Sequence, residues 1–120
     1  MTPLQEPTFF MLAALASESL HGYGIIQRVA ELSHDRVKLR AGTLYPALDR
    51  LTNDGIVELD REEVVDGRLR RYYRLTDSGA TLLAADLERQ RRNADAAAAR
   101  LAARTTTPAP ARRAPRVRPA

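Results

Sequence analysis

Four arginines lie within seven residues near the middle of the chain, beside a matching set of acids. The arginines are Arg68, Arg70, Arg71 and Arg74, and they follow an Asp66-Gly67 pair that is itself preceded by Glu58, Asp60, Glu62 and Glu63. An Asp-Gly pair between two strand-like stretches predicts a tight hairpin. Two interpretations stand side by side: cross-strand Arg–Glu pairing, or contact of the arginines with phosphate groups. For Arg68 and Arg70, nearest the turn, we expect phosphate contact.

A second group of polar side chains precedes the hairpin on a predicted helix from Thr43 to Asp54. Leu44, Leu48 and Leu51 recur at helical spacing and define its buried face. Thr43, Tyr45, Pro46 and Arg50 then lie on its outer face or flanks, and Lys38 and Arg40 lie in the loop before it. A hydroxyl, a phenol and cationic side chains suit contacts with phosphates and base edges of DNA. We expect Pro46 in the first turn and Gly55 just after the helix.

Other kinds of chemistry find little support in the sequence. The chain has no cysteine and two histidines, which excludes thiolate sites and argues against a metal. Ser17, Ser19 and His21 lie close together, but no nucleophile elbow or oxyanion turn accompanies them. We expect His21 to hydrogen-bond the backbone at a helix start, and the tyrosines Tyr23, Tyr72 and Tyr73 to be half-buried packing residues. The sequence predicts no enzyme and no cofactor.

The elements that must position these residues begin with an apolar helix. It is predicted from Thr8, as its cap, to about Ser17, with Pro7 just before it. Its apolar residues cover every face, so it should be buried on more than one side. We therefore expect Phe9, Phe10 and Leu12 to contact a second subunit. A turn over Ser17–Leu20 leads to a second helix from about His21, where two glycines indicate close backbone packing or close approach to the backbone of a ligand.

Two strands and a long helix complete the pattern. The strands are expected from Ile56 to Val64 and from Leu69 to Leu75, and Thr76 should cap a helix that persists to about Arg104. Leu83, Leu87 and Leu101 belong to a weak heptad-like seam on that helix, which predicts a dimer contact.

The predicted fold is mainly α with a small β-hairpin, in the order of a winged helix-turn-helix followed by a dimerisation helix. The boundaries are 1–76 for the DNA-binding domain, 77–104 for the dimerisation helix and 105–120 for a disordered basic tail rich in proline, alanine and arginine. The net charge is +4. Because residues 1–104 carry equal numbers of acidic and basic side chains, the tail supplies this whole excess.

Several blocks of the sequence resemble the PadR family of transcriptional regulators. They are His21-Gly22-Tyr23, Gly42-Thr43-Leu44-Tyr45-Pro46-Ala47-Leu48, Gly55-Ile56-Val57 and Arg71-Tyr72-Tyr73-Arg74-Leu75-Thr76 with Gly79. The resemblance spans about residues 8 to 85 and looks like the branch with a short C-terminal part. It implies a dimeric repressor, often sensing a small molecule, with Thr43, Tyr45 and Pro46 at the DNA-facing start of the recognition helix and Arg68, Arg70 and Arg71 on the wing.

The sequence therefore favours a cytoplasmic, homodimeric repressor that binds double-stranded DNA, and a small-molecule effector, unidentified, is implied only by the family resemblance. No membrane contact is expected, because no apolar run is long enough to span a bilayer. The alternative is a winged-helix adapter whose third helix binds a protein. Salt dependence separates the two, since phosphate contacts release counterions.

Overall fold

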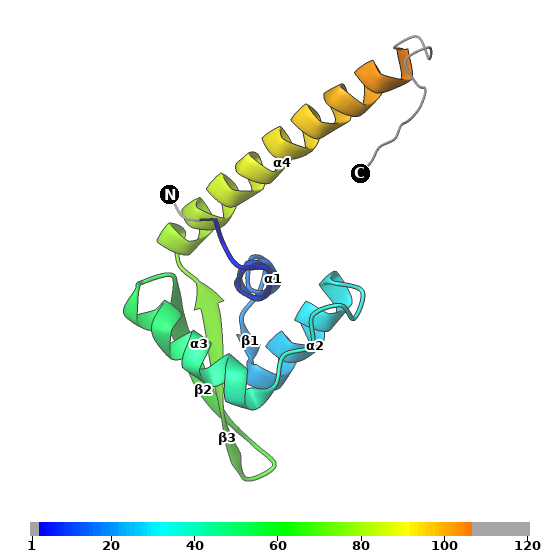
Figure 1. Ribbon diagram of the computed structural model, residues 1–120. Helices are drawn as coiled ribbons and strands as arrows, with labels where there is room; N and C mark the ends of the chain where they lie inside the picture. Colours follow the sequence, from blue (N-terminus) through cyan, green and yellow to red (C-terminus); the bar gives the residue numbers. More distant parts are fainter. Residues whose placement is uncertain (1–2, 107–120) are drawn as a thin grey trace. The chain divides into compact units, whose positions relative to one another are not determined.

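The computed structural model describes residues 3–106 and places seven elements along the chain (Figure 1). They are α1 (Glu6–Ala14), β1 (Leu20–His21), α2 (Gly22–Leu32), α3 (Ala41–Asn53), β2 (Val57–Val65), β3 (Arg68–Leu75) and α4 (Asp77–Thr106). The helix α4 continues two residues into the segment predicted as a tail, and the rest of that segment lies outside the described residues. None of the helices described is long and apolar enough to cross a membrane.

The chain divides into two compact units, residues 1–87 and residues 88–120. The first unit holds a core to which α1, α2, α3 and β2 all contribute. Its fully buried side chains include Met11, Leu12, Ile25, Val29, Leu44, Leu48 and Val57. Because the apolar stripes of three helices meet there, the outer face of α3 remains free to carry polar side chains.

The first helix begins earlier than the sequence indicates. Gln5 is its N-cap residue, Pro7 lies in its first turn, and Thr8 lies inside it, so the prediction of Thr8 as the cap is wrong. Proline is favoured in a first turn because its missing N–H breaks no helical hydrogen bond. Arg36 donates to Glu6 at 2.6 Å, which ties the loop after α2 to the start of α1.

The position of Pro46 also differs from the prediction. Since α3 begins at Ala41, Pro46 lies in the helix interior and not in its first turn. A proline there cannot donate to the carbonyl four residues earlier, that of Gly42, and its ring crowds the same carbonyl. The segment Gly42–Pro46 is therefore held in the helix by the burial of Leu44, which has no exposed surface, rather than by local preference.

The wing is a three-stranded antiparallel sheet in the order β1-β3-β2, one strand more than predicted. The short β1 pairs Leu20 with Tyr73 and His21 with Tyr72, where we expected a turn. The register between β2 and β3 shifts between Leu59 and Arg61, so that the backbone of Asp60 is paired with no residue of β3. Asp60 accepts a hydrogen bond from Ser19 at 2.8 Å, and this bond is the first cause that holds the pKa of Asp60 below its ordinary value.

Two predicted turn and cap features are confirmed. Asp66 and Gly67 both have positive φ, of 51° and 76°, as a two-residue hairpin turn with the twist of its strands requires. Thr76 caps α4, because its hydroxyl accepts from the backbone N–H of Gly79 at 3.0 Å. The fold is thus the expected one: mainly helical, a winged helix-turn-helix followed by a long C-terminal helix.

Candidate nucleic-acid interface

The outer face of α3 carries the side chains predicted for DNA contact. Thr43, Tyr45, Pro46 and Arg50 are all exposed, whereas Leu44, Ala47, Leu48 and Leu51 are buried beneath them. Tyr45 keeps 47% of its surface exposed. The alternation follows from helical spacing, which turns one stripe of α3 into the core and leaves the opposite stripe in solvent.

The loop before α3 also exposes two cations, Lys38 and Arg40, but through an extended segment instead of a helix. The hydroxyl of Ser33 accepts from the backbone N–H of Val37 at 2.9 Å, which fixes the start of an extended segment. In that segment Val37 and Leu39 are buried and Lys38 and Arg40 are exposed. Because side chains of an extended chain point alternately to opposite sides, anchoring the two apolar residues directs both cations outward.

The arginines of the wing divide into two sets. Arg71 donates to Glu62 at 2.9 Å, and Arg74 donates to Glu58 at 2.7 Å and to Asp60 at 2.9 Å. Arg68 and Arg70, closest to the turn, form no ion pair with any residue the structure describes. The cross-strand pairing interpretation is therefore correct for Arg71 and Arg74 and does not hold for the two arginines at the tip.

The same distinction, between cations that form ion pairs and cations that do not, applies to the whole first unit. Of its ten lysine and arginine residues, all of them described, five form ion pairs: Arg28, Arg36, Arg61, Arg71 and Arg74. The five without an ion pair are Lys38, Arg40, Arg50, Arg68 and Arg70, which lie in the loop before α3, on α3 and on the wing. A cation whose charge no carboxylate neutralises is the kind that attracts phosphate.

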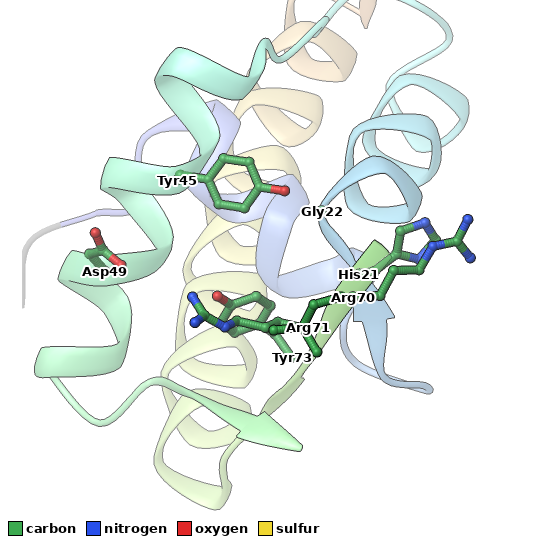
Figure 2. A pocket seen from close by; sticks show the side chains of 8 residues that line it. His21, Gly22, Tyr45, Asp49, Arg70, Arg71 and Tyr73 are labelled. Carbon is green, nitrogen blue, oxygen red and sulfur yellow. The ribbon is translucent and has the colours of Figure 1, made fainter. Parts of the chain in front are cut away.

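A groove runs between α3 and the sheet. Two adjoining hollows of about 450 and 440 Å³ form it, and both are lined by Asp49, Arg71 and Tyr73. The first is also lined by His21, Tyr45 and Arg70 (Figure 2). Figure 2 shows Arg70 extending beside His21, while Arg71 extends in the other direction, toward the side on which Asp49 lies. Phenol, imidazole, guanidinium and carboxylate groups thus line the same open groove.

The ring of Tyr45 packs against Gly22. It extends from α3 over the start of α2, and a Cβ atom at position 22 would collide with the Tyr45 hydroxyl oxygen (Figure 2). The close backbone packing expected from the glycines is confirmed at Gly22. At Gly24, by contrast, a Cβ would make only ordinary contacts. The structure therefore gives Tyr45 a packing role, and its exposed part faces the groove.

The sequence predicted that His21 hydrogen-bonds the backbone at a helix start, and the structure shows no such bond. His21 occupies the N-cap position of α2, but its side chain makes no capping hydrogen bond. The imidazole lies against the ring of Tyr72, with 5.4 Å between centroids. Burial, followed by the positive charge of Arg70, lowers the pKa of His21 from its ordinary value of 6.5. Of the tyrosines expected to be half-buried, Tyr72 and Tyr73 are so, whereas Tyr23 is 63% exposed.

Nothing in the sequence placed three of the residues that line the groove at a DNA-binding site: His21, Asp49 and Tyr73. The helical pattern does place Asp49 on the outer face of α3, but only the sheet register brings Tyr73 and His21 opposite it. No three metal-ligating side chains come together in the part of the chain that the structure describes.

The residues predicted for dimer contact fall in different environments. Leu12 and Leu83 belong to the core of the first unit, with exposed fractions of 0% and 8%, so neither offers a surface to a partner. Phe9, Phe10 and Leu87 are half-buried. The two phenylalanine rings pack edge to face, 5.3 Å apart. Leu101 is 62% exposed.

Comparisons with known proteins agree on one family. Residues 11–85 match the family model described as the transcriptional regulator PadR-like family. The chain is 42% identical over 71 residues to the transcriptional regulator Rv3488 of Mycobacterium tuberculosis; this alignment covers 59% of the chain and 63% of that protein. The chain therefore spans less than two thirds of this relative's length.

Two solved structures are similar in fold. Bacillus subtilis PadR, solved in complex with operator DNA, superposes with a TM-score of 0.63 at 26% identity, over 72% of this chain and 48% of that one. A PadR family regulator from Clostridium difficile gives a TM-score of 0.68 at 23% identity, over 81% of this chain and 99% of that one.

Proposed function

Because the chain belongs to the PadR-like family of transcriptional regulators, which are not enzymes, we propose that it is a homodimeric repressor that binds duplex DNA sequence-specifically. The helix α3 enters the major groove, and the tip of the β2–β3 hairpin contacts the adjacent backbone. The relative solved with operator DNA supports this assignment.

The observation that carries the proposal is the placement of the cations without ion pairs. In the first unit they lie in the loop before α3, on α3 and on the wing, the elements that a winged helix-turn-helix applies to DNA. Arg28 on α2, Arg36 just after it, and Arg71 and Arg74 in the part of the wing away from the turn are instead neutralised by carboxylates within 2.6 to 3.1 Å. The unneutralised charge is therefore confined to one set of elements.

Duplex binding as a function of salt tests the proposal. The association constant should fall steeply with salt, with a slope of log K against log salt of about −0.9 per phosphate contact. Replacing Arg40 and Arg50 by alanine should flatten that slope. The matched control is replacement of Arg28 and Arg36, which removes the same charge from ion-paired positions. If this chain instead binds a partner protein independently of salt and does not bind duplexes, the winged-helix adapter is supported.

We place the dimer contact on α1 and α4. Phe9 and Phe10 keep part of their surface exposed on α1, and Leu101 stands largely exposed on α4. An apolar side chain of that size on an alanine-rich helix gains stability by packing against a second helix. Leu101 is also the better probe than Leu83, because an aspartate at the buried Leu83 would disrupt the protomer itself.

Sedimentation of the Leu101→Asp variant tests this contact. We expect it to be monomeric at micromolar concentration, with its helical signal largely retained. The control is Ala99→Asp, an exposed position two residues away and so on the other side of the helix. A wild-type protein that is already monomeric contradicts the dimer proposal, as does a Leu101→Asp variant that sediments as the wild type does.

Repression follows if the operator overlaps the promoter, because a bound dimer then excludes the polymerase. A reporter gene placed behind the selected binding site should be expressed less when the protein is present. Higher expression would mean activation instead. A small-molecule effector remains a prediction from the family resemblance.

A further inference from the structure

Asp49 is the charged side chain at the centre of the outer face of α3. With 3.6 residues per turn, the positions furthest round the helix from the buried leucines are Gly42, Pro46, Asp49 and Asn53. Gly42 and Pro46 carry no polar side-chain atom, and Asn53 is the last residue of the helix. The middle of this face therefore presents a carboxylate.

That carboxylate is not engaged by a cation. In the part of the chain described, no arginine, lysine or histidine forms an ion pair with Asp49. Its neighbour across the groove, Arg71, donates to Glu62 at 2.9 Å. The pKa of Arg71 is raised first by that hydrogen bond, and Asp49 is the smallest of the contributions. Asp49 is exposed, so its oxygens are available to an external donor.

A free carboxylate at the centre of a DNA-facing helix is repelled by every phosphate. Among the groups of the DNA, only a hydrogen-bond donor on a base edge offers it a compensating interaction. The major groove offers two such donors, the N4 amino group of cytosine and the N6 amino group of adenine. The adenine amino group lies beside the N7 acceptor of the same base, which repels a carboxylate, whereas cytosine carries no second acceptor on its major-groove edge.

We infer that Asp49 accepts a hydrogen bond from the N4 amino group of a cytosine in each half-site and so sets the base preference at that position. The inference rests on the proposed function, since it requires α3 to lie in the major groove. It makes Asp49 a specificity-determining residue that lowers affinity for DNA in general and restores it at the matching base.

Selection from a library of random duplexes tests the inference with three proteins: the wild type, Asp49→Asn and Asp49→Ala. The wild type should select cytosine at one position of each half-site, by about tenfold over other bases. Asp49→Ala should lose the preference at that position alone and bind random DNA at least as well as the wild type. Asp49→Asn should change the preference toward adenine, because an amide can bond both N6 and N7.

The matched control is Asp54→Asn. Asp54 follows α3 directly and continues the spacing of Ala47 and Leu51, so it lies off the outer stripe while carrying the same charge. Its selected site should be that of the wild type.

Two failures remain distinguishable. If the wild type shows no salt-dependent duplex binding, the proposed function is wrong, and the inference about Asp49, which depends on it, is wrong as well. If the wild type selects a site, but Asp49→Ala selects the same bases at every position with uniformly higher affinity, Asp49 is only a repelling charge and the inference is overturned. An Asp49→Ala variant that loses all preference together with helical signal is misfolded, and Asp49→Asn, nearly identical in volume, then decides.

Discussion

The stem and the tip of the wing have similar arginines in different electrostatic surroundings. In the stem, residues 57–62 with 71–75, Arg71 and Arg74 face acids across the strands and bond to them. In the tip, residues 63–70, Arg68 faces Val65, and Arg70 faces Glu63, whose carboxylate bonds instead to Arg61 at 2.8 Å. The register leaves Arg68 without an acid opposite it, and Arg61 takes the acid that lies opposite Arg70, so both arginines of the tip keep their charge for a ligand.

The largest effect is expected from removing the charges at the tip. Arg68→Ala combined with Arg70→Ala should lower the affinity for all duplexes on the order of 100-fold at low salt, and should flatten the salt slope by about 0.9 for each phosphate that the variant no longer binds. The matched change in the stem, Arg71→Ala with Arg74→Ala, removes the same formal charge but should cost much less affinity. Affinity is measured by titration at several salt concentrations. If the two variants lose the same affinity, the arginines of the tip and of the stem do not differ in their contribution to DNA binding.

A smaller effect should follow from giving an arginine of the tip an acid opposite it, as the arginines of the stem have. Val65→Glu places a carboxylate directly opposite Arg68, in the arrangement that neutralises Arg71 and Arg74. We expect affinity to fall by about 3- to 10-fold, with the free energy of unfolding changed by less than about 1 kcal/mol, as is usual for exposed ion pairs. The neutral control is Val65→Gln. If the control lowers affinity as much, the loss comes from the shape of the tip and not from its charge.

A change in the turn backbone should mainly alter stability. Gly67 has a φ of +76°, so Gly67→Ala should lower the free energy of unfolding by about 1 kcal/mol. Gly42→Ala makes the same chemical change inside α3, where nothing lies within 4 Å of the added Cβ. It should raise stability by up to about 1 kcal/mol, through helix propensity. Urea denaturation measures the free energy of unfolding of both variants. If the two substitutions change it in the same direction, the assignment of the turn is contradicted.

The smallest effect concerns His21, which senses the charge of the tip. Burial and Arg70 together lower its pKa in the folded state, so the unfolded chain takes up the proton first. The His21 contribution to stability is therefore lost as pH falls below its ordinary value of 6.5 and toward the lowered pKa. In an NMR titration, Arg70→Ala should raise the pKa of His21, whereas Arg68→Ala should leave it near that of the wild type. A pKa unaffected by Arg70→Ala would show that burial alone lowers it.

Features that depend on near neighbours in the chain were predictable. The Asp66-Gly67 turn and the Thr76 cap each follow from the preferences of a few adjacent residues, and both are present. The buried stripe of α3 was predictable as well, because three leucines at helical spacing have one common face.

Features that depend on distant partners were not predictable. The strand β1 has two residues, too few to show alternation, and it exists because β3 supplies its hydrogen-bonding partner. Pro46 lies in the helix interior against its own preference, held by burial of the residues around it. Likewise, the sequence offered both pairing and phosphate contact for the wing arginines. The register, which places Arg68 opposite Val65, and the bond of Arg61 to Glu63 separate the two sets, and both depend on the folded sheet.

The contact between Tyr45 and Gly22 links two positions that lie 23 residues apart in the sequence. Since the phenol occupies the space in which a Cβ at position 22 would lie, a residue larger than glycine at position 22 requires the Tyr45 ring to move or to be replaced. A related chain with alanine or serine at position 22 should therefore carry a smaller residue at position 45, and the two should change together over evolution. Such a paired change would reshape the surface presented by the third helix without altering the helix itself.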